Sequence, residues 1–188
     1  MTATLATYRR PACAVVQLAA RCRFLAILCG FVIACLPAPL LAKDLPRLVL
    51  FDIELHDASH EGQIDGVRED QSRRLQRLNL EAAKLFEKTG LYQLVDISSA
   101  ADEIEKLKPL RRCNGCDLDI AKRFNADYAV LGFVYKVSNL ILEIHLYLRD
   151  AKTGAVINHM HTNIRGNTDE SWLRGLRWLI KNRLKPNE

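Results

Sequence analysis

Hydrophobic and polar positions alternate with a period of two from residue 126 onwards, which predicts three consecutive β-strands. The three segments are ADYAVLGFVYKVS, LILEIHLYLRD and AVINHMHTNI, and short turn sequences, SN and AKTG, separate them. In the middle segment, leucine and isoleucine fall on one side of the strand and polar residues on the other. We therefore expect an antiparallel meander with one buried face.

Before and after this meander, apolar residues recur at helical spacing. The segment EDQSRRLQRLNLEAAKLFEKTG ends at Gly90, a residue typical of helix C-caps. Residues 167–184 carry an apolar stripe, and Asn167 and Glu170 at its start predict a capping box. Two shorter helices are expected over residues 98–107, with a serine cap and an end before Pro109, and over residues 116–125.

Two apolar segments in the first half of the chain have the composition of buried strands. They are PRLVLFDIEL, residues 46–55, which a polar loop follows through Val67, and LYQLVDI, residues 91–97. The order of elements is thus β-α-β-α-α-β-β-β-α. This order predicts an α/β (α+β) fold with a mixed sheet of about five strands, a C-terminal antiparallel meander and a closing amphipathic helix.

The first 42 residues contain four arginines, no Asp or Glu, and a long apolar run. A basic leader followed by such a run is typical of a secretory signal peptide, here ending near Ala42. Residues 43–188 would then form a single periplasmic domain. Two alternatives remain open: the apolar run of 19 residues, 24–42, is long enough for an uncleaved membrane anchor, and VIAC resembles a lipobox that would lipidate Cys35.

The charge of the chain depends strongly on this leader. Removing its four arginines lowers the formal net charge from +5 to +1. The remaining domain is nearly neutral, so its charge does not indicate a nucleic-acid partner. Arg73, Arg74 and Arg77 lie close together on one predicted helix, but acidic residues surround them and favour a solvated surface of mixed charge.

Cys113 and Cys116 are the two cysteines that remain after the leader is removed. An even pair in an oxidising compartment is expected to be oxidised. We expect a local disulfide that constrains the loop before a helix. Thiol–disulfide exchange is an alternative because CxxC precedes a helix, although no strand precedes the motif as in thioredoxin-like sites. Metal ligation is a third reading, but the chain has no second CxxC.

The last two strands of the meander bring three histidines to one face. A register with an even index sum places Val156, Met160 and Ile164 on the leucine face. His159 and His161 then lie on the outer face with His145 and Glu143. A two-residue turn on the other side of the middle strand would pair Val137 with Leu140 and place Gly132 opposite His145. The residues named in this pattern are Glu143, His145, His159, His161, Gly132, Val137 and Leu140.

Three imidazoles and a carboxylate on adjacent strands are ligands that zinc, copper or nickel prefers. Glu143, His145, His159 and His161 are therefore a candidate metal site. The alternative is that these outward positions form local hydrogen bonds or contact solvent. No cofactor is otherwise expected.

The last predicted helix carries an aromatic residue away from its apolar stripe. Trp178 lies beside Arg174 and Arg177 in the sequence. An exposed tryptophan among cations can anchor a partner protein, so these residues are a candidate partner-binding site. The alternative is that Trp178 covers an edge of the sheet.

Two segments, LFEKTGLYQLVD and AKRFNADYAVLGFVYKVSNLILEIHLYLRDAKTGAVI, resemble the core of TolB amino-terminal and CsgG-like periplasmic domains. The mature chain, with RRCNGCDLDIAKR, KVSNLILEI and IRGNTDESWLRGLRWL, is more closely similar to a group of proteobacterial exported proteins classed as a domain of unknown function. The resemblance implies a periplasmic interaction or assembly module and not an enzyme.

Sequence motifs of common catalytic sites are absent from the chain. It has no phosphate-binding glycine loop, nucleophile elbow, zincin helix or dinucleotide fingerprint. We expect a non-enzymatic binding or assembly accessory protein of the bacterial periplasm, whose partner is a periplasmic or envelope protein. The alternative function is thiol–disulfide exchange or metal handling through the CNGC pair or the histidines.

Overall fold

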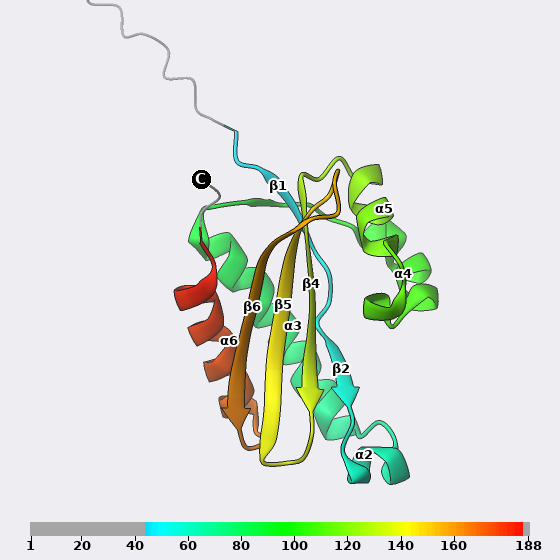
Figure 1. The fold of residues 1–188 in the computed structure, drawn as a ribbon, viewed down its shortest axis with the longest axis vertical. Coiled ribbons are helices and arrows are strands. Elements are labelled where there is room, and N and C mark those ends of the chain that lie inside the picture. The colour runs from blue at the N-terminus through cyan, green and yellow to red at the C-terminus, as the bar shows by residue number, and fades with distance from the viewer. Residues whose placement is uncertain (1–43, 186–188) are drawn as a thin grey trace, which may run out of the picture. The chain divides into compact units, whose positions relative to one another are not determined.

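The computed structural model describes residues 44–185 (Figure 1). The predictions of a signal peptide, a membrane anchor and lipidation at Cys35 concern residues outside this range. Within it, the chain forms one mixed sheet and a set of helices, which confirms the predicted α/β (α+β) class. No helix of residues 44–185 is long and apolar enough to cross a membrane.

The sheet contains six strands, one more than expected, in the order β3-β1-β4-β5-β6 with β2 also paired to β4. The strands are β1 Arg47–Leu50, β2 Glu54–Asp57, β3 Gln93–Leu94, β4 Tyr128–Lys136, β5 Ile141–Asp150 and β6 Val156–Arg165. The helices are α2 His60–Asp65, α3 Glu69–Thr89, α4 Ala101–Leu107, α5 Cys116–Arg123 and α6 Asp169–Arg183, with 3-10 turns η1 Ser98–Ala100 and η2 Leu110–Arg112.

The additional strand arises because residues 46–55 do not form one continuous strand. β1 and β2 both run parallel to β4 along the same edge. Between the pairs Leu50–Val130 and Glu54–Phe133, the first segment advances by four residues and β4 by three. The extra residue is a bulge-like irregularity that separates the two strands. The predicted loop through Val67 also contains the short helix α2, which Ser59 caps by accepting a hydrogen bond from Gly62 N–H at 3.1 Å.

Helices cover the two faces of the sheet to different extents (Figure 1). α3 and α6 cover one face over its main hydrophobic core, which includes the leucines of β5, Phe86 and Trp172. α4, η2 and α5 cover part of the opposite face near β1 and the start of β4, where a second core lies around Phe51, Leu110 and Ile120. No described helix packs on the remainder of that face, which β5, β6 and the end of β4 form.

The predicted even register between β5 and β6 is confirmed, with Leu142 opposite Ile164 and Leu146 opposite Met160. The expected position of Val156 on the leucine face is wrong. An irregularity next to Leu148 shifts the register, so Val156 lies opposite Arg149 and is 54% exposed.

The predicted two-residue turn between β4 and β5 is also wrong. Residues 137–140 form a longer connection, in which the N–H groups of Val137 and Ser138 both donate to Ile141 C=O at 3.1 Å. Gly132 therefore lies opposite Leu146, and Phe133 takes the position opposite His145. The small residue is needed there because a Cβ at Gly132 would lie 2.5 Å from Cδ2 of Leu146.

Two of the expected helix caps differ in the structure. Thr168, and not Asn167, caps α6: its hydroxyl accepts from Ser171 N–H, and the Ser171 hydroxyl accepts from Thr168 N–H, each at 3.2 Å. α4 begins after the turn η1 and has no side-chain cap, because the hydroxyl of Ser98 instead donates to Asp96 at 3.1 Å. The C-cap of α3 at Gly90, with φ of 64°, is confirmed.

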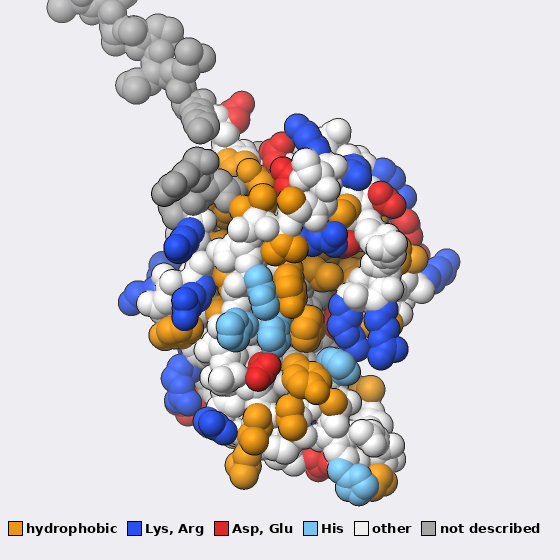
Figure 2. Space-filling view, viewed as in Figure 1, with side chains coloured by type: hydrophobic (Ala, Val, Ile, Leu, Met, Phe, Trp, Pro, Cys, Tyr) orange, Lys and Arg blue, Asp and Glu red, His pale blue; other side chains and the backbone are white. Residues whose placement is uncertain are grey.

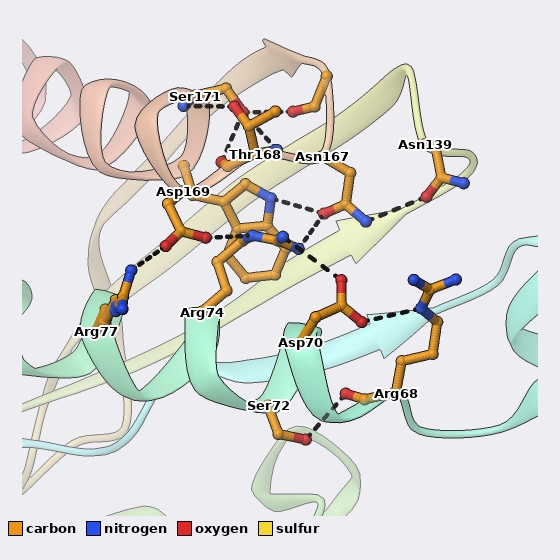
Figure 3. A network of polar contacts seen from close by, with 12 residues as sticks. Arg68, Asp70, Ser72, Arg74, Arg77, Asn139, Asn167, Thr168, Asp169 and Ser171 are labelled. Atoms are coloured by element: carbon orange, nitrogen blue, oxygen red, sulfur yellow. Dashed lines mark hydrogen bonds and ion pairs between the residues drawn. The ribbon is translucent and has the colours of Figure 1, made fainter.

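A polar cluster around Arg74 joins α3 to α6 (Figure 3). The guanidinium of Arg74 donates to Asp169 and to Asn167, both at 2.9 Å, and lies 5.5 Å from the ring centroid of Trp172. The indole N–H of Trp172 donates to the same Asn167 oxygen at 3.1 Å. Arg74 is only 10% exposed, so the expected solvated surface is wrong for this residue, because it is ordered against the last helix.

Replacing Arg74 with alanine is expected to lower the free energy of unfolding by about 1.5–3 kcal/mol, because charged hydrogen bonds and the contact with Trp172 are lost. Arg73, 57% exposed and paired only with Glu69 of its own helix, is the matched control. Its replacement with alanine should change stability by no more than about 0.5 kcal/mol. Urea denaturation of both variants measures the difference, and equal losses would contradict the assigned role of Arg74.

Candidate functional site

The uncovered part of the sheet carries aligned rows of aromatic side chains. One row across β4, β5 and β6 consists of Phe133, His145 and His161, and the next contains Tyr147 and His159. We call these five residues, together with Glu143, the histidine face. Figure 2 shows histidine side chains gathered at the centre of this surface, between hydrophobic side chains.

A chain of hydrogen bonds connects three side chains of the histidine face. Nε2 of His145 lies 3.0 Å from the carboxylate of Glu143, and Nδ1 of His145 lies 3.2 Å from Nε2 of His159. The ring of His159 stacks on Tyr147 with centroids 4.1 Å apart and an interplanar angle of 6°. Phe133 stacks on His145 at 4.9 Å. These contacts hold the rings in a fixed, nearly parallel arrangement.

Aromatic rings make up most of the histidine face, and their packing affects the charge of His159. Desolvation, together with the neighbouring His145 and His161, lowers the pKa of His159 from its ordinary value of 6.5. The neutral imidazole is therefore favoured at this position. A row of stacked aromatic rings whose edges can still form hydrogen bonds is suited to contact with another protein, because interfaces are enriched in aromatic residues.

The four candidate metal ligands lie together, as the register predicted. The rings of His145, His159 and His161 are nearly parallel, with interplanar angles of 15° between the first and each of the others. In this arrangement, no group of three or more His, Cys, Asp or Glu side chains within residues 44–185 is placed to hold a metal ion. The metal site stays a prediction, and binding would require the rings to turn so that their nitrogens converge.

A cavity of about 430 Å³ adjoins the histidine face through Phe133 and Tyr147. Its other walls include Arg111, Arg112 and Arg149. Arg149 donates two hydrogen bonds to Asp117, at 2.7 and 3.0 Å, and Arg111 pairs with Glu54 at 3.2 Å. Within the described residues no ion pair is found for Arg112, which is exposed at the cavity wall.

The sulfur atoms of Cys113 and Cys116 are at disulfide-bonding distance, with Cα atoms 5.6 Å apart. Gly115, with φ of 95°, lies between the two cysteines, and Cys116 is the first residue of α5. The 3-10 turn η2 precedes the pair. The disulfide and its redox alternative stay predictions, and the structure confirms that the motif follows a turn and not a strand.

The candidate partner-binding residues on α6 lie apart from the histidine face. Trp178 is 45% exposed, and its ring contacts the guanidinium of Arg183 at 5.6 Å. Arg174 pairs with Glu170 at 3.2 Å and Arg177 with Glu81 at 2.7 Å. Both arginines that were predicted to contact a partner thus form ion pairs with acidic residues of this chain. The role of Trp178 in partner binding stays a prediction.

Sequence reasoning missed a buried cation at the end of β4. Lys136 is fully buried, and its Nζ lies 2.8 Å from Asp57 and 3.4 Å from Glu61. Burial alone would raise the pKa of Asp57, but hydrogen bonds from Lys136 and Ser59 lower it overall. The sequence did contain a signal for this burial. Side chains two residues apart in a strand share a face, so Lys136 lies on the same inner face as Val134.

Residues 46–184 match the family model described as "Protein of unknown function (DUF2380)". The chain belongs to this family. A comparison with curated proteins gives no match.

The chain is also similar to solved structures of proteins from several bacteria. The LpoB C-terminal domain from Escherichia coli is 14% identical, with 72% of this chain and 93% of that chain covered and a TM-score of 0.44. Lipoprotein GNA1162 from Neisseria meningitidis is 12% identical, with 65% and 82% covered and a TM-score of 0.43. A PelC dodecamer from Paraburkholderia phytofirmans is 19% identical, with 79% and 90% covered and a TM-score of 0.42. The resemblance to TolB and CsgG-like domains stays a prediction.

The lowered pKa of His159 predicts a loss of stability in mild acid. The unfolded chain binds a proton at this residue more readily than the folded chain, so the contribution is complete above about pH 6.5 and decreases as the pH falls towards the folded pKa. We expect His159→Gln to lose less stability between pH 7.5 and 5.5 than the unmodified chain, as measured by urea denaturation.

His60→Gln is the control for this effect, because His60 lies at the start of α2, outside the histidine face. It should show the same loss as the unmodified chain. If His159→Gln also shows that loss, His159 does not contribute to the pH dependence.

Proposed function

We propose that the protein is a non-enzymatic accessory protein of the bacterial cell envelope, and that it binds an envelope protein through the histidine face. The observation that carries the proposal is the row of stacked rings on a part of the sheet that no described helix covers. The basic and apolar leader of the sequence, typical of a secretory signal, supports an exported location.

The composition of the histidine face favours binding over catalysis. Its polar atoms bond mainly to one another, in the chain from Glu143 through His145 to His159. Stacked aromatic rings lose little conformational freedom when a partner covers them, because neighbouring rings already restrict their motion. A surface of this kind supplies the rigid aromatic contacts that dominate binding energy at protein interfaces.

The adjoining cavity gives the proposed interface a pocket for a partner side chain. Apolar walls from Leu131 and Val156 enclose it on the sheet, and Arg112 lies at its wall. A partner side chain that is partly apolar and ends in a carboxylate or carbonyl group would satisfy both features. We therefore place the centre of the interface at Tyr147, which borders both the cavity and the stacked rings.

Site-specific photo-crosslinking in bacteria that produce the protein naturally tests this proposal. Tyr147 is replaced by p-benzoylphenylalanine, which keeps an aromatic ring at the position. We expect irradiation to give a discrete crosslinked product with one envelope protein. The same replacement at Leu80, which is 66% exposed on α3, serves as the control.

The Leu80 position should not give that product, because α3 covers the opposite face of the sheet. A crosslink from Tyr147 that also forms from Leu80 would show non-specific contact. No discrete product from Tyr147, in protein that folds and is exported normally, would overturn the assignment of the histidine face as the binding surface.

A further inference from the structure

The outer edge of β2 is unpaired in the described part of the chain. β2 runs parallel to β4, from Glu54 opposite Phe133 to Asp57 opposite Lys136. No other strand of residues 44–185 pairs with β2. An unpaired strand edge presents backbone N–H and C=O groups that can bond to another extended segment. β2 therefore has one edge available for a further strand.

The pairing with β4 determines which backbone groups point to this free edge. The N–H of Ala58 donates to Lys136 C=O at 2.9 Å, on the β4 side. Backbone groups of successive residues in a strand point to opposite sides, so His56 also faces β4. The N–H and C=O groups of Leu55 and Asp57 consequently point away from β4.

The side-chain amide of Asn79 in α3 already binds the same edge at Ile53, the residue just before β2. The N–H of Ile53 donates to the Asn79 side-chain oxygen at 2.8 Å, and the Asn79 amide nitrogen lies 3.5 Å from Ile53 C=O. Leu75 and Gln71 precede Asn79 at intervals of four residues, so all three share one side of α3. Gln71 therefore lies beside the residues of β2 that follow Ile53.

Within residues 44–185, neither atom of the Gln71 amide group has a hydrogen-bond partner, although Gln71 is only 1% exposed. Buried amide groups in folded proteins are nearly always bonded, so this exception is consistent with a partner from outside the described residues. A side-chain amide has one acceptor oxygen and one donor nitrogen, which together match the N–H and C=O of a single residue in an extended segment, since both point to the same side. The amide of Gln71 can therefore accept from and donate to a peptide backbone, as the amide of Asn79 does with the backbone of Ile53.

A groove lies between the free edge of β2, α3 and residues 105–111. Two adjoining cavities of about 290 and 610 Å³ form it. Gln71 lines the smaller cavity and Asn79 the larger one. The walls that both cavities share are Leu55, Val67, Ser72, Leu75 and Arg111.

We propose that this groove binds an extended segment of a partner polypeptide, which adds to β2 as a further strand. The backbone of the segment bonds to Leu55 and Asp57, and the N–H and C=O of one of its residues pair with the Gln71 amide. β2 has four residues, about 13 Å at the usual rise per residue, so a segment of about four to six residues fills the edge.

The side chains that the segment directs into the groove are uncharged and mainly apolar. Leu55, Leu75 and Val67 form the apolar wall, and Val67 is 82% exposed. Most of the charged groups that line the two cavities already form ion pairs: Arg111 with Glu54 at 3.2 Å, Lys108 with Glu105 at 2.7 Å, and Asp57 with Lys136 at 2.8 Å. The proposed site differs from the histidine face in its elements and in its chemistry, since recognition here rests on backbone hydrogen bonds.

A random dodecapeptide library displayed on phage, selected against residues 43–188, supplies the probe. The selected peptide is synthesised, its dissociation constant is measured by calorimetry, and its site is located by NMR. We expect the largest shifts at the amides of Leu55 and Asp57 and at the side-chain amide of Gln71. The backbone nitrogens of the peptide are then methylated one at a time. Methylation at every second position should abolish binding, and methylation at the positions between should not, because every second N–H of an added strand bonds to β2.

Gln71→Leu should weaken binding of the peptide about tenfold while the chain stays folded, because it removes both amide atoms and keeps the shape of the side chain. Gln93→Leu, at an exposed position of β3, is the matched control and should bind as the unmodified chain does. His159→Ala should also bind normally, which separates this site from the histidine face.

Three results would overturn the proposal. They are a library that yields no binder, a peptide whose NMR shifts follow β6 or the histidine face, and a free chain that is dimeric by light scattering and whose Leu55 and Asp57 amides are protected from hydrogen exchange. In the last case a second copy of the chain, and not a partner segment, would occupy the edge.

Discussion

β4 bonds to three other strands, β1 and β2 along one edge and β5 along the other. A strand has only two edges, so β1 and β2 must share one of them in succession. The extra residue between them lets the chain resume pairing after β1, and β3 extends only beside β1. Among the described strands, none is left to pair with the outer edge of β2 for this reason. The position of the groove therefore follows from how β4 is paired.

The helices complete this arrangement by covering the sheet unevenly. The cluster around Arg74, Asn167 and Trp172 joins α3 to α6 on one face, while the shorter helices cover only the start of β4 on the other. Aromatic rings then occupy the positions that no helix of residues 44–185 covers, and they are ordered by stacking on one another. Both proposed binding surfaces are parts of the sheet that the helices leave accessible.

Much of this fold could be predicted from the sequence, because two-residue alternation in β5 and β6 and the apolar stripes of α3 and α6 are strong local signals. The even register brought His145 opposite His161 as predicted. The interruption after Leu50 and the longer turn at residues 137–140 depend on tertiary pairing, which local patterns do not specify. The same turn placed Phe133, and not Gly132, beside His145. The unbonded amide of Gln71 is visible only once α3 is packed against β2.

The central claim of this account is that β2 has a free outer edge beside an open groove. Hydrogen exchange of individual backbone amides, followed by NMR on the folded chain, tests it most directly. The account predicts slow exchange for the N–H groups of His56 and Ala58, which face β4, and fast exchange for Leu55 and Asp57. Equal protection of all four amides would show that another segment pairs with this edge and would contradict the account.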